Sequence, residues 1–320
     1  MQDALLLLLG VVLLTGGGEA LIRGSLAAAR RLGVSPLLIG LVIVGFGTSA
    51  PELVVSVDAA MNERPDIAIG NVVGSNIGNI LLILGICALI TPLAVRPLVL
   101  RRDAVTVVAA SLLFLVLVGG SALQRTDAAI LLLALGAYLL WAYVTERTHA
   151  PPSAALRTAE AEELSAVPKS AAWIVAAVVL GLLLLVGGSR VLLAGAVGIA
   201  ESAGLSEAVI GLTLVAVGTS LPELSISVIA ALRRHADVAV GNVLGSNIFN
   251  LLGILGVSAL LQPLPVPARI LAFDQWVMLG TAVLLLAFLY SGRRLTRLEG
   301  AFLLLGYAVY VGLSVTVVNA

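Results

Sequence analysis

The chain has 320 residues, of which 60% are hydrophobic and only 11% are charged, and its mean hydropathy is +1.13. A soluble globular domain carries about 25% charged residues, so this composition excludes soluble enzymes and nucleic-acid-binding proteins and indicates a membrane protein. The 18 basic and 18 acidic residues cancel, and no net charge favours nucleic acid as a partner.

Ten apolar segments follow one another along the chain, and each is close to the roughly 20 residues that cross a bilayer as a helix. They are residues 4–32, 36–61, 66–91, 103–119, 127–145, 170–200, 207–232, 237–262, 272–290 and 297–318. The start, Met1-Gln2-Asp3, has no basic region of the kind that precedes a signal peptide. We therefore expect an all-α membrane protein with ten transmembrane helices, the first of which is not cleaved.

One polar stretch, residues 146–169, divides the ten segments into five and five. We expect residues 1–145 to form an N-terminal repeat and residues 170–320 a C-terminal repeat. The stretch between them is too short to bury a core of its own, so it is interpreted as a solvated linker. Its acidic run Glu160-Ala161-Glu162-Glu163 leaves a regulatory cation site as the alternative.

The basic residues indicate the orientation, because cytoplasmic loops are enriched in Arg and Lys. With the N-terminus outside, 13 of the 18 basic residues fall on the cytoplasmic side, three fall in outer loops, and Arg23 and Arg190 lie within segments. The sequence therefore predicts a multi-pass protein of the cell (inner) membrane, with both termini outside and residues 146–169 in the cytoplasm.

The two halves carry one sequence twice. Residues 39–93 align with residues 210–264 at a constant offset of 171 without a gap, and 32 of the 55 aligned positions are identical. The copies begin in the second and the seventh segments, an odd number of crossings apart, so they cross the membrane in opposite directions. Inverted repeats are typical of secondary transporters, whose substrate sites lie near the midplane. We therefore expect two inverted five-helix repeats and a transporter rather than an enzyme.

Each copy places the motif Gly-Thr-Ser-x-Pro-Glu-Leu inside an apolar segment, with Glu52 in the first copy and Glu223 in the second. A carboxylate inside a membrane costs about 3 kcal/mol or more unless it is paired or solvated, and a cation would compensate both acids. Pro51 and Pro222 lack an N–H group, which frees carbonyl oxygens that can face a cavity. Hydroxyl oxygens stand nearby, at Thr48, Ser49, Thr219 and Ser220.

The second repeated motif is Gly-Asn-Val-x-Gly-Ser-Asn-Ile-x-Asn. It places Ser75 and Asn79 in one copy, and Ser246 and Asn250 in the other, at the i,i+4 spacing that shares a helix face. The acid and the serine of each copy lie about ten residues on either side of the loop that joins them, or ~15 Å at ~1.5 Å per residue. That is half of a ~30 Å hydrocarbon core, so both motifs are expected at the bilayer centre.

Other polar and small residues of the repeats find less support as ligands. Asp58 is matched by Ile229 and Glu19 by Arg190, so the repeat does not support either acid as part of the site. Four motif asparagines either bind the ion or hydrogen-bond between helices, and these are Asn71, Asn76, Asn242 and Asn247. Four motif glycines are expected to allow close helix packing, and these are Gly70, Gly74, Gly241 and Gly245.

A cluster of carboxylate, hydroxyl, amide and carbonyl oxygens suits a hard cation, and Ca²⁺ takes six to eight oxygen ligands in irregular geometry. Two carboxylates neutralise one Ca²⁺ ion. The same acids could hold Na⁺ or protons instead, and competition between ions at one site is the basis of exchange.

The paired GTSxPEL and GNVxGSNIxN motifs resemble the two alpha-repeats of the sodium/calcium exchanger family, within the cation/calcium exchanger superfamily. The resemblance covers nearly the whole chain. It implies an antiporter that exchanges Na⁺ for Ca²⁺ by alternating access and normally extrudes Ca²⁺, while the first segment of each half slides across the other helices. Ca²⁺ and Na⁺ are then substrates, no cofactor is required, the lipid bilayer is the surrounding, and protein partners are left open.

The same resemblance assigns ligands. It carries ion-binding roles onto Thr48, Ser49, Glu52, Ser75, Asn79, Thr219, Ser220, Glu223, Ser246 and Asn250, and it suggests the backbone carbonyls of Gly45 and Ala216. Position 250 is Asn, where some prokaryotic and potassium-dependent relatives carry an acid, so a K⁺ requirement stays open.

Two alternatives remain. Proton/calcium exchangers of the superfamily carry a different pattern in place of these motifs, which makes proton coupling the second interpretation. A passive cation channel is the alternative from a different class. Channels usually repeat around a pore through oligomer symmetry, and an inverted repeat within one chain argues against a channel.

Overall fold

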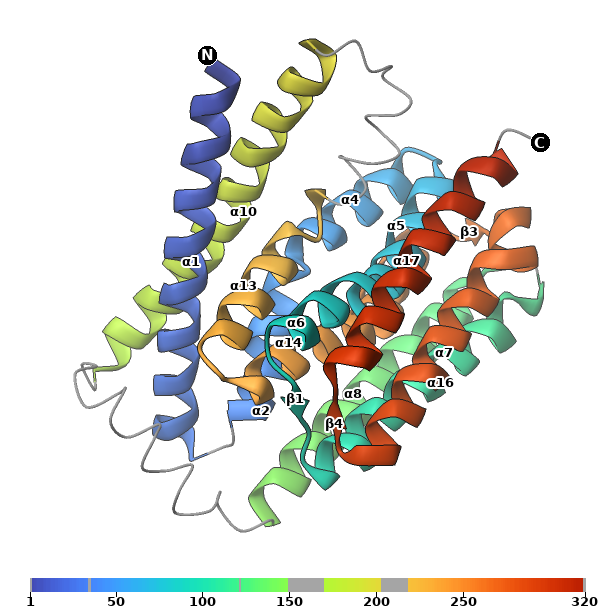
Figure 1. Ribbon diagram of the computed structural model, residues 1–320. Coiled ribbons are helices and arrows are strands. Elements are labelled where there is room, and N and C mark those ends of the chain that lie inside the picture. The colour runs from blue at the N-terminus through green and yellow to red at the C-terminus, as the bar shows by residue number, and fades with distance from the viewer. Residues whose placement is uncertain (1, 34–35, 121, 149–169, 203–217, 319–320) are drawn as a thin grey trace.

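The computed structural model describes residues 2–33, 36–120, 122–148, 170–202 and 218–318 (Figure 1). These residues are almost entirely helical, which confirms the all-α prediction. Two short antiparallel ladders join the halves outside the helices. They pair β1 (Leu93–Ala94) with β4 (Arg294–Leu295), and β2 (Ala122–Leu123) with β3 (Leu264–Pro265).

The helices follow the expected segments closely. In the first half they are α1 (Gln2–Leu32), α2 (Pro36–Ile39), α3 (Phe46–Thr48), α4 (Ala50–Met61), α5 (Pro65–Gly78), α6 (Gly85–Ile90), α7 (Val105–Leu117) and α8 (Arg125–Thr148). In the second half they are α10 (Ala171–Ser202), α13 (Leu221–Leu232), α14 (Ala236–Ile248), α15 (Leu255–Leu261), α16 (Gln275–Gly292) and α17 (Arg297–Val318). Most of the linker 146–169 and the start of the expected segment 207–232 lie outside the described residues.

Seven described helices are long and apolar enough to cross a membrane, and the bent pair Gly40–Thr48 and Ala50–Met61 makes an eighth if it is counted as one span. Large apolar side chains cover the outer surface, with Val116 and Leu133 both 74% exposed and Leu298 84% exposed. In water such a surface would be unfavourable. The fold is therefore that of a multi-pass membrane protein.

Several spans contain short π-helical segments, in which one extra residue is inserted into the helix. They are η1 (Gly40–Gly45), η2 (Asn79–Leu84), η3 (Val99–Ala104), η6 (Phe249–Ile254) and η7 (Ile270–Asp274). η2 joins α5 to α6, and η6 joins α14 to α15, so the two spans that carry the second motif are interrupted at matching places. Such insertions are frequent at functional sites.

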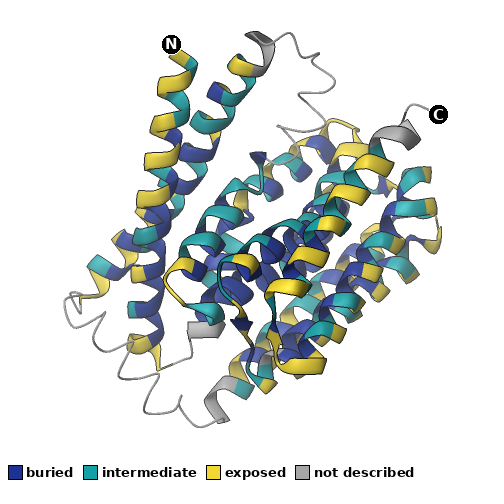
Figure 2. Ribbon diagram, viewed as in Figure 1, coloured by how far each residue is buried: buried dark blue, intermediate teal, exposed yellow. Residues whose placement is uncertain are grey.

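The spans that carry the second motif form the centre of the molecule. In their most apolar stretches, 67% of the residues within Pro65–Ile90 and 83% within Ala236–Leu261 are buried, compared with 22–39% in the other long spans. Figure 2 shows this buried centre surrounded by helices with exposed outer faces. A site built on these two spans is therefore surrounded by the other described helices.

The long helices α1 and α10 lie side by side at one edge of the bundle (Figure 1). Glycines occur at every seventh residue in both, and a Cβ atom at Gly17 would lie 2.9 Å from the carbonyl oxygen of Gly181. A Cβ at Gly10 would meet Leu192, and one at Gly24 would meet Val178, so the two helices are antiparallel. Their backbones touch because no side chain separates them, as in other glycine-lined membrane helix pairs.

Candidate ion-binding site

Two breaks in the helices position the two acids. α4 and α13 each begin with Pro at the second residue, and the serines before them, Ser49 (φ −79°, ψ 8°) and Ser220 (φ −87°, ψ 8°), leave the helical conformation. Proline causes the break because it cannot donate to the preceding turn. Glu52 and Glu223 follow in the first turns of the new helices, and each is only 1% exposed.

The two motifs are joined across the repeat. Ser49 Oγ donates a hydrogen bond to Glu223 Oε1 at 2.9 Å, and Ser220 Oγ donates one to Glu52 Oε1 at 3.2 Å. Each acid is therefore held by the serine of the other copy. This exchange brings the two carboxyl groups into one cluster, and each hydroxyl retains lone pairs that can face a cation.

Several buried oxygen atoms of the expected ligand residues are left without a hydrogen-bond partner among the described residues. Buried polar groups are nearly always satisfied, and an exception calls for an explanation such as an ion. The unpartnered oxygens are Glu52 Oε2, Glu223 Oε2, Asn79 Oδ1, Asn250 Oδ1 and Thr219 Oγ1. The set consists of two carboxylate, two amide and one hydroxyl oxygen, which is the donor chemistry of a Ca²⁺ or Na⁺ site.

A second set of asparagines holds the framework. Asn71 Nδ2 donates to the carbonyl of Glu52 at 3.2 Å and to Ser56 Oγ at 3.0 Å, while Asn242 Nδ2 donates to the carbonyl of Glu223 at 3.2 Å and to Ser227 Oγ at 2.8 Å. Both asparagines thus fasten an acid-bearing helix to its neighbour, which favours the helix-linking interpretation. The sequence analysis did not single out Ser56 and Ser227, although serine occurs at both of these matching positions of the repeat.

The asparagines of the second motif connect the central spans. Asn79 Nδ2 donates to Asn247 Oδ1 at 2.9 Å, and Asn247 Nδ2 donates to the carbonyl of Asn76 at 3.2 Å. Asn76 Nδ2 binds the carbonyl of Val72 at 2.7 Å within its own helix. Asn79 is thereby fixed with its amide oxygen free.

The carbonyl of Gly45 is already engaged. It accepts hydrogen bonds from Ser246 Oγ at 3.0 Å, from Thr48 Oγ1 at 3.4 Å and from the Ser49 backbone N–H at 3.3 Å. Thr48 Oγ1 also lies 3.1 Å from Asn242 Oδ1. An ion could bind this carbonyl only if a donor turned away. Its expected counterpart, Ala216, lies outside the described residues.

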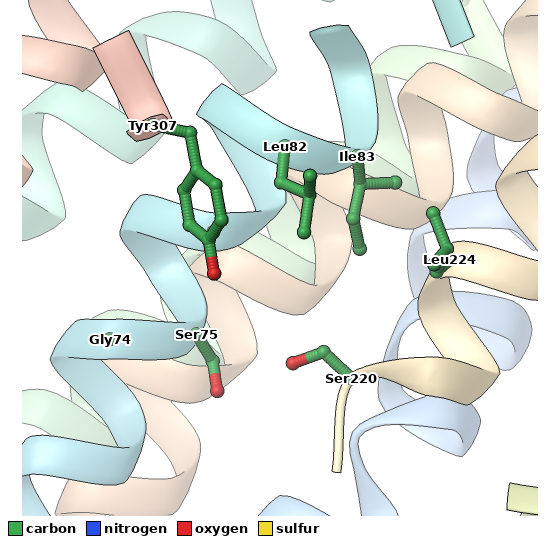
Figure 3. Close-up of a pocket in the computed structure, with 8 residues that line it drawn as sticks. Gly74, Ser75, Leu82, Ile83, Ser220, Leu224 and Tyr307 are labelled. Atoms are coloured by element: carbon green, nitrogen blue, oxygen red, sulfur yellow. The ribbon is translucent and has the colours of Figure 1, made fainter. Parts of the chain in front are cut away.

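A small cavity of about 30 Å³ is lined by Ser75, Ser220 and Tyr307 among others, and its Ser220 is the residue that donates to Glu52. Figure 3 shows the Ser220 hydroxyl pointing towards Ser75 and the Tyr307 ring reaching towards both from α17. A water molecule needs about 10–15 Å³, so the cavity admits a water-sized species. The repeat could not predict a role for Tyr307, because the matching position in the first half is Gly136.

The structure describes eleven of the twelve expected ligand residues, and each of the eleven carries a hydrogen-bonded, unpartnered or cavity-lining atom. A sequence profile described as sodium/calcium exchanger protein matches residues 3–144 and 173–316. The chain belongs to the sodium/calcium exchanger family. The family predicted from the paired motifs is confirmed.

Named relatives of this exchanger family match nearly end to end. A putative antiporter, CaxA of Alkalimonas amylolytica, is 41% identical over 309 residues, which cover 95% of both chains. Inner membrane protein YrbG of Escherichia coli K12 is 35% identical over 286 residues, covering 87% of this chain and 86% of that protein. Sodium/calcium exchanger MaX1 of Methanosarcina acetivorans is 33% identical over 349 residues, covering 96% and 97%.

A solved structure of the sodium-calcium exchanger NCX_Mj, soaked without Na⁺ and Ca²⁺, superposes with a TM-score of 0.82 at 30% identity. The match covers 97% of this chain and 98% of that one. Sequence and fold therefore agree on an exchanger.

Proposed function

We propose that this protein is a secondary antiporter that exchanges Na⁺ for Ca²⁺ at one shared site by alternating access, and that it normally extrudes Ca²⁺. The observation that carries the proposal is the set of unpartnered buried oxygens on Glu52, Glu223 and three further expected ligand residues. Two carboxylates balance one Ca²⁺, whereas at least two Na⁺ are needed for the same charge. The two ions therefore compete for the acids, and the names of MaX1 and NCX_Mj support this pairing of substrates.

The proposed ligands form two groups. The unpartnered oxygens of Glu52, Glu223, Asn79, Asn250 and Thr219 bind directly. The hydroxyls that already donate hydrogen bonds, or that line the cavity, complete the shell through their lone pairs, and these are Thr48, Ser49, Ser75, Ser220 and Ser246. The carbonyls of Gly45 and Ala216 join when their present donors release them.

We further propose ten transmembrane helices in two inverted five-helix repeats, residues 1–145 and 170–320, with both termini outside. The antiparallel packing of α1 on α10, which match at the repeat offset, supports the inversion. A cysteine at position 155, within the linker, should react with a membrane-impermeant reagent only from the cytoplasmic side. Labelling of that position from outside intact cells would contradict the orientation.

The decisive experiment is Ca²⁺ flux in proteoliposomes under separate Na⁺, K⁺ and H⁺ gradients. An opposing Na⁺ gradient should drive Ca²⁺ flux without K⁺. Strict K⁺ dependence, or equal flux driven by H⁺ in sodium-free buffer, would identify a neighbouring branch of the superfamily. Ca²⁺ flux that is independent of any counter-ion would identify a channel.

A further inference from the structure

Two charged residues of α1 and α10 lie at matching positions of the repeat but carry opposite charge. Glu19 on α1 and Arg190 on α10 are separated by the offset of 171, and neither contributes to the cluster of acids. Glu19 binds Arg23 on its own helix at 2.6 Å and Arg233, beyond the end of α13, at 2.7 Å. The Glu19–Arg233 pair therefore ties α1 to the bundle in this conformation.

The turns after α13 and α4 also differ in charge. The turn after α13 contains Arg233 and Arg234, whereas the matching positions after α4 are Asn62 and Glu63, followed by Arg64. The two turns have the same backbone shape, since φ is 60° at Arg234 and 56° at Glu63. The two turns therefore share a backbone conformation but differ in charge.

One turn earlier, the two helices differ in a second way. Ile229 of α13 fills the space beside Gly18 of α1, because its Cδ1 atom occupies the position that a Cβ atom would need. The residues at the repeat offset are Asp58 on α4 and Ser189 on α10. An apolar contact on one side of the molecule is therefore replaced by a polar pair in the sequence of the other.

Neither Arg190 nor Asp58 forms an ion pair with a described residue in this conformation. Arg190 is exposed and forms no ion pair with the part of the chain that is described. Asp58 is also exposed, and its carboxylate accepts a hydrogen bond from Asn62 Nδ2 at 3.2 Å. Both groups are free to meet a new partner.

Because the halves share one sequence in opposite orientations, a conformation in which they exchange contacts is accessible to an inverted-repeat transporter. In such a conformation, a contact between Ser189 and Asp58 would replace the present contact between Gly18 and Ile229. Arg190 would then occupy the place that Glu19 holds here. We propose that Arg190 and Asp58 form the ion pair that closes the outer face in the alternative conformation, as Glu19 and Arg233 close the cytoplasmic face in this one. This inference rests on the proposed alternating-access function.

The reversal of charge has a physical reason. Basic residues concentrate on the cytoplasmic side of membrane proteins, so the turn after α13 carries the arginines and α1 supplies the acid. On the outer face the acid lies in α4, and α10 supplies the arginine. A partly exposed pair of this kind shifts an equilibrium by about two- to five-fold, which biases the two conformations without locking either.

Cysteine cross-linking tests the two pairs in a Cys87→Ser background, chosen because Ser258 stands at the matching position. Glu19→Cys with Arg233→Cys, and Asp58→Cys with Arg190→Cys, should each form a disulfide when the proteoliposomes are treated with a thiol oxidant. Ion conditions that raise one yield should lower the other by about two-fold or more. Asp58→Cys with Arg23→Cys is the control that should not cross-link.

Failure of the second pair to cross-link under any ion condition, while the first forms, would overturn the proposal. So would both disulfides forming in equal yield under all conditions. Arg190→Ala and Asp58→Ala should each change the exchange rate about two- to five-fold at unchanged Ca²⁺ affinity, and Arg190→Asp with Asp58→Arg should restore it. If the effects of the two changes on the exchange rate were simply additive in the double variant, an ion pair between Arg190 and Asp58 would be excluded.

Wild-type flux in the same liposomes separates this proposal from the proposed function. Absence of sodium-dependent Ca²⁺ flux in the wild type would refute the exchange function, whereas mutually exclusive disulfides would still establish the two alternative contacts. Normal wild-type exchange with no Asp58–Arg190 contact would refute the ion pair alone.

Discussion

Glu223 and Glu52 stand in the same motif, yet their surroundings differ. On the side of Glu223, Ser246 is fully buried and donates to the carbonyl of Gly45. α14 and η1 touch backbone to backbone there, since a Cβ atom at Gly45 would lie 2.9 Å from the Ser246 nitrogen and one at Gly245 would collide with the Leu41 carbonyl. This side of the site is closed by the main chain itself.

On the side of Glu52 the serine is partly open. Ser75 is 8% exposed and lines the cavity with Ser220 (Figure 3). A Cβ atom at Gly74 would meet no described atom within 4 Å. The comparison teaches that the duplicated sequence places the same side chains twice, while packing gives the two copies different surroundings.

The largest expected effect tests whether the two acids are equivalent in spite of these surroundings. Glu52→Gln and Glu223→Gln should each lower Ca²⁺ exchange by at least about 100-fold, because each removes half of the charge that offsets a divalent ion. Flux in proteoliposomes measures the loss, and normal membrane insertion controls for folding. Wild-type exchange by either variant would refute its role as a central ligand.

Removal of Ca²⁺ should lower the stability of the folded protein if the ion binds at this site. Ca²⁺ at one hundred times its dissociation constant should add about 2.7 kcal/mol to the free energy of unfolding, and chelation should remove it. Thermal unfolding of purified protein measures the shift. Mg²⁺ is the matched control, since it demands regular octahedral geometry and dehydrates reluctantly. An equal shift with Mg²⁺, or an undiminished Ca²⁺ shift in Glu52→Gln, would contradict the assignment.

A pair of glycine variants sharpens the contrast between the packed and the open side. Gly245→Ala should destabilise the protein by about 1–3 kcal/mol, because the new methyl group meets Leu41. Gly74→Ala should be neutral or stabilising by up to about 1 kcal/mol, because alanine favours helix at an unobstructed position. Equal effects of the two changes on the unfolding temperature would show that the sides do not differ.

The smallest expected effect concerns the amides. Asn250 has no described hydrogen-bond partner at either amide atom, so Asn250→Asp adds a charge without breaking a contact. The Na⁺ concentration for half-maximal exchange should change about five-fold, as expected for ~1 kcal/mol of screened charge interaction, while Ca²⁺ binding changes less.

Asn79→Asp is the matched variant. Asn79 donates to Asn247 Oδ1, and an aspartate there would place two acceptors face to face at a cost of about 1–3 kcal/mol. A loss of stability in Asn79→Asp but not in Asn250→Asp would distinguish the two sides, and identical behaviour of both variants would contradict the distinction.

The sequence predicted the helical class, the apolar spans and the exchanger family, because apolar length and a duplicated motif are local signals. It could not predict that Ser49 would bind Glu223 and Ser220 would bind Glu52, since both contacts depend on how distant helices meet. Close packing at the motif glycines is observed at Gly245, but not among the described neighbours of Gly74. Identical residues acquired different surroundings, and no pattern within either copy records that difference.

The π-helical insertions were beyond prediction for a related reason. An extra residue in a turn leaves the apolar pattern almost unchanged, so η2 and η6 read as ordinary helix. The structure shows that Asn79 begins η2 and Asn250 is the second residue of η6. The insertions therefore alter the direction of two proposed ligands that spacing alone would have placed on a regular helix.

The glycine seam between α1 and α10 has a mechanical consequence. It runs from Gly10 to Gly24, fourteen residues or about 21 Å at ~1.5 Å per residue, which is most of the ~30 Å thickness of the hydrocarbon core. Helices in backbone contact over that length are expected to move together rather than separately. If the pair moves during the proposed alternating access, the displacement that admits an ion at one face would at once close the opposite face.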